Sequence, residues 1–183
     1  MNVWKVVLGI ASVMLVSIPA SAHDATTDQD IVHRAAAQYE LDQLTAPISS
    51  PEDLRSHLQV GLHASPLRYL SQAGLRRFVS SLSFGENGVS GFSYEDIERE
   101  LTATQAYELL SLIGQQQFTH RIRGLRVESG LDSEIMAGTI RSACEIPQGT
   151  MEAIMCDSFL DGYRCSDPGN CAESKRNACT SNC

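Results

Sequence analysis

The segment TATQAYELLSLIG, residues 102–114, has the clearest helical pattern in the chain. Thr102 and Gln105 have the spacing of a capping box, in which two side chains bind the free backbone N–H groups at a helix start. Apolar residues then recur at helical intervals, at Ala106, Leu109, Leu110 and Ile113. Gly114 is expected to end or kink the helix. The segment therefore predicts a buried helix at the centre of the fold.

Weaker helical patterns flank this segment on both sides. Residues 30–44 and 131–143 have apolar positions spaced for helices. Ser50-Pro51 and Ser65-Pro66 each combine a capping serine with a proline that suits the first turn of a helix. Residues 115–125 fit either a helix or one face of a strand, and their helical neighbours favour the helix.

Strand signals are weak throughout the chain. Residues 85–91 contain three glycines and are typical of a turn followed by a loop. No long alternating pattern appears elsewhere, and no internal repeat is present. The sequence therefore predicts an all-α fold, a compact domain of about six short helices with a disulfide-linked C-terminal tail.

The N-terminal segment has the pattern of an export signal. Residues 1–22 contain Lys5, an apolar run from Val6 to Ile18, and the small residues Ala20-Ser21-Ala22, which are the three parts of a cleaved signal. The apolar run is shorter than the roughly 20 residues that a membrane-spanning helix needs. We expect a secreted or periplasmic protein that begins at His23 after cleavage and does not insert stably into a membrane.

All the cysteines lie between residues 144 and 183, at Cys144, Cys156, Cys165, Cys171, Cys179 and Cys183. In an exported chain an even number of cysteines predicts a disulfide framework, here three bridges, with free or intermolecular thiols as the alternative. Zinc-binding spacings are missing. The turn sequence Asp167-Pro168-Gly169-Asn170 separates Cys165 from Cys171, so a bridge between these two is one hypothesis. The expected organisation is a helical domain, residues 23–143, followed by a Cys-rich segment, residues 144–183.

Composition and motifs exclude several functions. The chain has 22 acidic and 14 basic residues, a net charge of −8, which argues against nucleic acid or an anionic membrane surface as its partner. The motifs of serine hydrolases, zinc proteases, phosphate-binding loops and calcium-binding loops do not occur. We therefore expect no cofactor, and the sequence assigns no catalytic residue.

Two charged clusters and one histidine are the remaining candidates. Arg121, Arg123 and Arg126 either pair with the acidic residues 95–100 or bind an anionic group on a partner. The acidic residues themselves fit a solvated helix face. After cleavage, His23 would offer an amine and an imidazole to Cu(II). That site would need a second ligand such as His33, so the sequence does not favour a metal.

These observations favour an exported, non-enzymatic binding or accessory protein, such as an inhibitor, an envelope-interaction protein or an effector. It would use a disulfide-stabilised surface to bind a protein partner. The alternative is a secreted or periplasmic hydrolase whose site forms only in the fold, with His57 or His63 beside Glu95 or Glu98. A toxin whose activity lies in residues 144–183 is a third possibility.

Overall fold

The computed structural model describes residues 25–138 and 159–183. The chain is mixed α/β, with about 51% helix and 24% strand, so the all-α prediction is wrong. The α-helices are α1 (Ala25–Leu44), α2 (Pro51–Val60), α3 (Gln72–Ser81), α4 (Glu95–Glu100), α5 (Ala103–Ser111) and α6 (Gly130–Met136). The 3₁₀ helices are η1 (Leu62–Ala64), η2 (Pro66–Tyr69) and η3 (Gln116–Arg121). The strands are β1 (Ser83–Gly85), β2 (Gly88–Ser93), β3 (Phe159–Asp167) and β4 (Asn170–Thr180).

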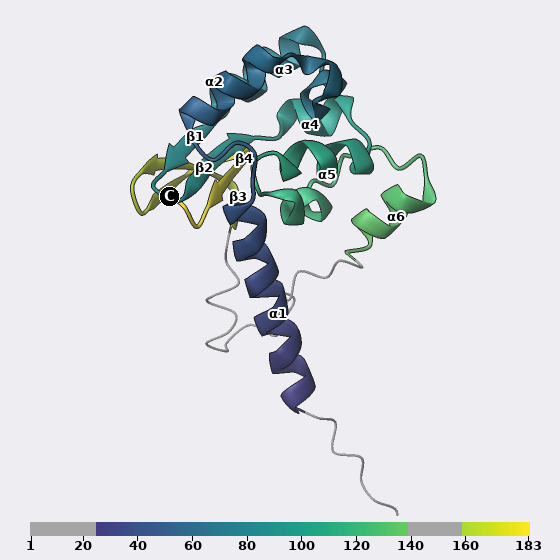
Figure 1. Cartoon of the computed structure of the whole chain (residues 1–183). Helices are drawn as coiled ribbons and strands as arrows, with labels where there is room; N and C mark the ends of the chain where they lie inside the picture. The colour runs from purple at the N-terminus through teal and green to yellow at the C-terminus, as the bar shows by residue number, and fades with distance from the viewer. Residues whose placement is uncertain (1–24, 139–158) are drawn as a thin grey trace, which may run out of the picture.

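The four strands form one antiparallel sheet in the order β1-β2-β4-β3. Strands from the middle and from the end of the chain lie side by side in it, because β2 pairs with β4 at Gly91 and Cys179 (Figure 1). The C-terminal segment thus supplies two of the four strands. Phe159 and Ala178 are buried in the same core cluster as the helices.

Strand β2 shows why sequence patterns predicted a loop there. Its sequence GVSGFS contains two glycines, which are rare in strands. Its first five residues are all buried, so the strand lacks the alternation of apolar and polar residues that marks a half-exposed strand. Burial on both faces therefore removed the signal that would have identified β2.

The β3–β4 hairpin bends back on itself. Cys171 and Cys179 are both in β4, yet their Cα atoms are 6.1 Å apart, whereas eight extended residues would span roughly 26 Å. The bend falls where the register jumps between the pairs Asp161–Ala178 and Tyr163–Glu173. Gly162 has φ +80 in one strand at this point, and Arg176 has φ +56 in the other. The outer half of the hairpin, residues 163–173, consequently folds back toward the end of β4.

Helix starts follow the capping predictions closely. The Thr102 and Gln105 capping box is present at the start of α5, whose Leu109 and Leu110 are fully buried. The Ser50 and Ser65 hydroxyls cap α2 and η2, although η2 is a 3₁₀ helix. Residues 116–121 also form a 3₁₀ helix rather than a longer α-helix. In the predicted helix 131–143 the structure describes α6 up to Met136, and residues 139–143 lie outside the described part.

Helix α1 projects away from the sheet and the other helices (Figure 1). Its last turns contact the body through Tyr39, whose ring packs edge-on against Phe159 with centroids 5.5 Å apart. Within residues 25–138 and 159–183, the helices all fall short of the length and apolar character needed to cross a membrane. The disulfides of the C-terminal segment are consistent with an extracellular location.

Candidate functional site

A cleft of about 640 Å³ opens between the tip of the β1–β2 hairpin and the turn of the β3–β4 hairpin, and we call it the hairpin cleft. One wall comes from β1, β2 and the turn between them. The other wall comes from the end of β3 and its turn, and the last residues of the chain complete the lining. The lining residues are Ser83, Phe84, Gly85, Glu86, Asn87, Ser90, Cys165, Ser166, Asp167, Pro168, Ser181, Asn182 and Cys183.

Asn182 fixes the end of the chain against the first wall. Its Nδ2 donates to Gln43 Oε1 of α1 at 2.8 Å and to the Val89 carbonyl of β2 at 3.3 Å. Its own carbonyl lies so close to Gly85 that a Cβ there would come within 1.9 Å of the oxygen. Glycine is therefore the residue that allows β1 and the chain end to meet.

A disulfide holds the second wall in place. Cys165 at the end of β3 is bonded to Cys183, and their Cα atoms are 5.6 Å apart. The second described bridge joins Cys171 to Cys179 across the bend of the hairpin. Cys165 and Cys171 do face each other in the sheet register, but each is bonded elsewhere. The hypothesis of a Cys165–Cys171 bridge is thus wrong, because the bend brings other partners to both residues.

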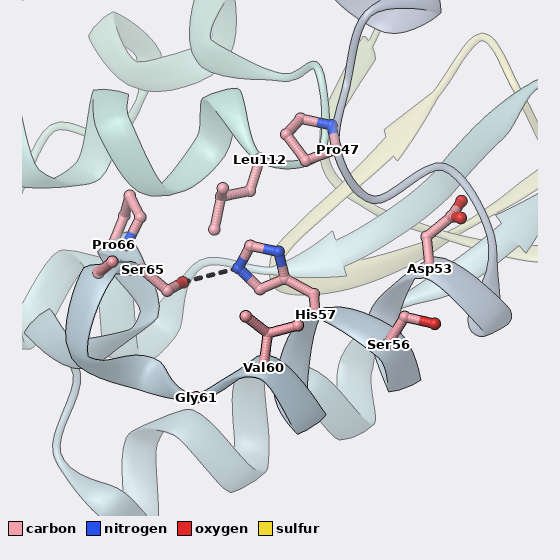
Figure 2. Close-up of a pocket in the computed structure, with 10 residues that line it drawn as sticks. Pro47, Asp53, Ser56, His57, Val60, Gly61, Ser65, Pro66 and Leu112 are labelled. Atoms are coloured by element: carbon pink, nitrogen blue, oxygen red, sulfur yellow. Dashed lines mark hydrogen bonds between the residues drawn. The ribbon is translucent and has the colours of Figure 1, made fainter.

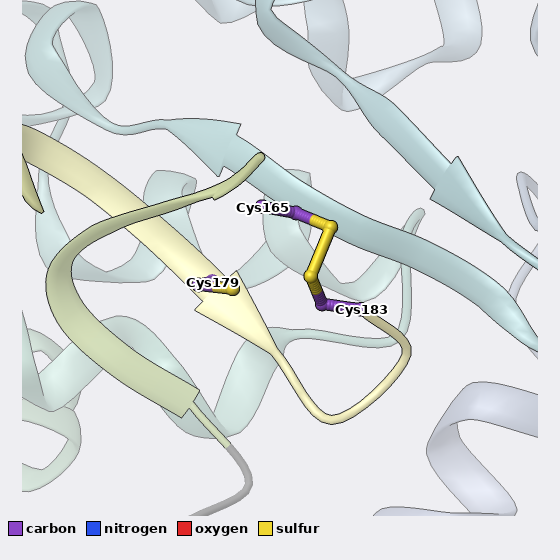
Figure 3. A group of neighbouring side chains, drawn as sticks. All are labelled: Cys165, Cys179 and Cys183. Carbon is purple, nitrogen blue, oxygen red and sulfur yellow. A yellow bond between two sulfur atoms is a disulfide. The ribbon is translucent and has the colours of Figure 1, made fainter. Parts of the chain in front are cut away.

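Three cysteine side chains lie close together, as Figure 3 shows, and two of them, Cys165 and Cys183, line the cleft. The Sγ atoms of Cys165, Cys179 and Cys183 lie within 4.8 Å of one another, a spacing that a metal ion can bridge. All three sulfurs are in disulfides, however, and metal binding requires thiolates. The two adjacent bridges therefore account for the cluster. Cys144 and Cys156 lie outside the described residues, so the third bridge stays a prediction.

The lining of the hairpin cleft combines acidic, hydroxyl and amide groups with apolar surface. Its charged side chains are Glu86 and Asp167, one on each wall and both exposed. Serine hydroxyls and the side-chain amides of Asn87 and Asn182 add hydrogen-bonding groups, and Phe84 supplies an aromatic ring. Among these lining residues there is no histidine, lysine or arginine, so the charged side chains of the cleft are acidic alone.

A second pocket of about 400 Å³ surrounds His57 on α2, and we call it the His57 pocket (Figure 2). The His57 Nε2 lies 2.8 Å from the Ser65 hydroxyl. Ser65 is buried, and its Oγ also accepts a hydrogen bond from the Leu67 N–H at 3.2 Å. Asp53 and Ser56 also line the pocket, and five further lining residues are apolar, namely Pro47, Val60, Ala64, Pro66 and Leu112. The pocket thus combines a histidine–serine pair with an apolar wall.

Asp53 lines the same pocket, but its carboxylate accepts hydrogen bonds from residues at the start of α2. Its Oδ2 accepts hydrogen bonds from the hydroxyls of Ser50 at 2.7 Å and Ser49 at 2.8 Å. These bonds hold the pKa of Asp53 below its usual range. Figure 2 shows the carboxylate directed away from the His57 ring. Asp53, the acidic residue among those that line the pocket, therefore does not orient the imidazole as the carboxylate of a catalytic triad does.

The three arginines predicted to bind a partner have separate surroundings. The Arg121 guanidinium lies 5.2 Å from the centre of the Phe159 ring. Arg126 forms an ion pair with Glu128 at 2.7 Å and donates to the Glu100 carbonyl at 2.9 Å. Arg123 is exposed. A partner-binding role for this set stays a prediction.

The residue pairs suggested for a hydrolase are not brought together. Glu95 and Glu98 on α4 form ion pairs with Arg176 of β4, at 3.5 and 3.0 Å, and neither lines the His57 pocket. His63 is exposed on η1.

Sequence reasoning missed the two features that the structure brings out. Ser65 and His57 are eight residues apart, a spacing that belongs to no common motif. The hairpin cleft depends on two turn sequences distant in the chain, around residues 85–88 and 167–170. The copper candidate His23 lies outside the described residues, and His33 is exposed on α1.

Comparison with known proteins yields no relative for this chain: none of the protein-family models, the curated proteins or the solved structures matches it. The chemistry of the two sites is therefore the basis for assigning a function.

Proposed function

We propose that this protein is an exported, non-enzymatic binding protein that holds a protein partner in the hairpin cleft. The observation that supports this is the construction of the cleft. Its walls come from two hairpins, and the Cys165–Cys183 bridge and Asn182 hold them together. A binding surface that is rigid before contact loses less conformational entropy on association. This construction is therefore suited to recognising a polypeptide without a chemical step.

The export part of the proposal is supported by the signal pattern of residues 1–22 and by the two described disulfides. We propose cleavage after Ala22, followed by release to the periplasm or the medium, where the two described disulfides would persist. N-terminal sequencing of the exported protein tests this proposal. A chain that begins at His23 is expected, and one that begins at Met1 would overturn it.

Site-specific photo-cross-linking tests the binding proposal. A benzophenone amino acid is placed at Ser166 or Ser181, which are exposed and line the cleft. The matched control carries it at Glu52, an exposed residue of α2 outside the lining of the cleft. Irradiation of producing cells is expected to join one protein to the two cleft positions and not to Glu52. Mass spectrometry then identifies the partner.

Removing the Cys165–Cys183 disulfide provides a second test of the binding proposal. Replacing Cys165 and Cys183 together with serine leaves no unpaired thiol from that bridge and frees the turn wall of the cleft. We expect the adduct at Ser166 to decrease several-fold in this variant. An adduct that forms equally at Glu52, or none at either cleft position, would refute a binding role for the cleft.

The contact between His57 and Ser65 supports a second candidate function, an esterase-like hydrolase. A histidine at 2.8 Å from a serine hydroxyl is the geometry in which imidazole removes the serine proton during nucleophilic attack. The apolar walls of the His57 pocket would suit an acyl chain. Capping of η2 by Ser65 is the structural explanation of the same contact.

A fluorophosphonate probe separates these two explanations, because it reacts with activated serines. If the pocket is catalytic, the probe labels Ser65, and labelling disappears in both Ser65→Ala and His57→Gln. Ser71→Ala is the matched control, since Ser71 also caps a helix, α3, but has Glu100 rather than a histidine as its side-chain partner. A protein that remains unlabelled has a capping serine at position 65 and no hydrolase activity of this kind.

A further inference from the structure

We propose that the hairpin cleft takes a cationic side chain of the partner protein, an arginine guanidinium or a lysine ammonium. This inference rests on the proposed binding function and specifies its chemistry. It follows from the charges, the aromatic ring and the volume that the two hairpins bring together.

The lining of the hairpin cleft contains two acidic residues. Glu86 lies at the tip of the β1–β2 hairpin and Asp167 at the β3–β4 turn, so each wall contributes one carboxylate. Within the described residues neither carboxylate forms an ion pair, whereas Glu95, Asp96, Glu98 and Glu128 all pair with arginines. Two acidic residues without a counter-ion among the described residues thus line one concave site.

The concave shape of the hairpin cleft strengthens the attraction of its two acidic residues for a cation. A cleft lined by one sign of charge concentrates the electrostatic field, because its walls have a lower dielectric constant than water. A cation between the walls would be attracted by both carboxylates. The net charge of −8 for the whole chain acts in the same direction at long range. An anionic ligand would be repelled by both effects.

Phe84 selects a cation with an apolar stem. Its half-buried ring packs on the core and lines the cleft beside Glu86. Lysine and arginine both have an aliphatic chain that packs on apolar surface and a charged end that is attracted to aromatic faces. A bare metal ion has no aliphatic chain to pack on the ring. A volume of about 640 Å³ lies in the range of pockets that enclose small ligands, so it accommodates such a side chain with its flanking backbone.

Peptide titration followed by NMR tests the inference on the full exported chain. The probes are acetyl-Gly-Arg-Gly-amide and its lysine analogue, and acetyl-Gly-Gln-Gly-amide is the neutral control. We expect saturable shifts of the Gly85, Ser166 and Asn182 amides with the two cationic peptides only. Glu86→Gln and Asp167→Asn should each raise Kd about three-fold, and the double variant about ten-fold, as expected for exposed charge pairs. Glu173→Gln, an exposed carboxylate outside the cleft lining, should leave Kd unchanged.

The outcomes separate this inference from the binding function itself. Two exposed ion pairs at the strong end of their usual range give a Kd of about 30 mM. Equal binding of the glutamine peptide, shifts confined to other surfaces, or the absence of any saturable shift up to about 100 mM would overturn the cationic inference. If cross-linking from Ser166 and Ser181 still succeeds in that case, the cleft binds a partner through other chemistry. If neither the peptide titration nor the cross-linking detects binding at the cleft, the proposed binding function is refuted as well.

Discussion

Replacing Phe118 with alanine is expected to lower the free energy of unfolding by about 3–5 kcal/mol, the usual effect of emptying a large buried aromatic site. Phe118 on η3 is fully buried. Its ring lies 5.5 Å from Phe92 of β2 and 5.3 Å from Phe159 of β3, both in edge-on geometry. The substitution therefore removes the side chain that joins the helices to both halves of the sheet. Urea unfolding followed by circular dichroism measures the change.

Two further variants show whether the sheet and the helices form one core. Phe159→Ala alters the C-terminal segment, 41 residues beyond Phe118, and should destabilise the same single transition. In a double-mutant cycle the two rings should be coupled by about 0.5–1.5 kcal/mol. Leu131→Ala is the control, because Leu131 is 54% exposed and should change stability by less than about 0.5 kcal/mol. A Phe159→Ala protein whose unfolding matches the wild type would mean that the C-terminal strands do not share the core.

This shared core explains where prediction from sequence succeeded and where it failed. Local signals were sufficient for the helix 103–111, because its capping box and apolar spacing all lie within one segment. The sheet depends on contacts between β2 and β4, about 90 residues apart. No local pattern encodes such pairing. Glycines in β2 and the bend at Arg176 obscured even the strand signals that were present.

The hairpin cleft, like the sheet, depends on contacts between distant segments of the chain. Cys165, Cys171, Cys179 and Cys183 form disulfides as predicted. Their pairing depends on the bend, where Arg176 adopts a positive φ that non-glycine residues rarely show. Its carbonyl accepts the Tyr94 N–H at 2.9 Å, and its side chain pairs with Glu98 at 3.0 Å. These contacts with α4 and its N-cap compensate for the backbone conformation. Tertiary contacts, which the sequence does not display, therefore determine the path of the hairpin and the shape of the cleft.

Asp132→Asn should lower the free energy of unfolding by about 2–4 kcal/mol, because buried charged hydrogen bonds are lost and donors are left facing donors. Asp132 is 2% exposed at the start of α6. Its Oδ1 accepts two bonds from Thr104, and its Oδ2 accepts three from Ser129 and Glu128. An amide nitrogen in either position would meet N–H or O–H groups. Glu173→Gln, an exposed acid in β4, is the control and should be nearly neutral.

The same carboxylate should make stability depend on acid pH. Burial raises the pKa of Asp132, but the hydrogen bonds from Thr104, Ser129 and Glu128 outweigh it and hold the pKa far below its usual range. The pKa of an aspartate in the unfolded chain is about 3.9. The stabilisation is therefore complete above that pH and is lost as the pH falls from about 4 toward the folded pKa, since the unfolded chain binds the proton more readily in that window. The stability difference between wild type and Asp132→Asn should be constant from about pH 7 to 5 and shrink below about pH 4. A difference that stays constant down to about pH 2 would mean that Asp132 does not stabilise the fold as an ionised acceptor.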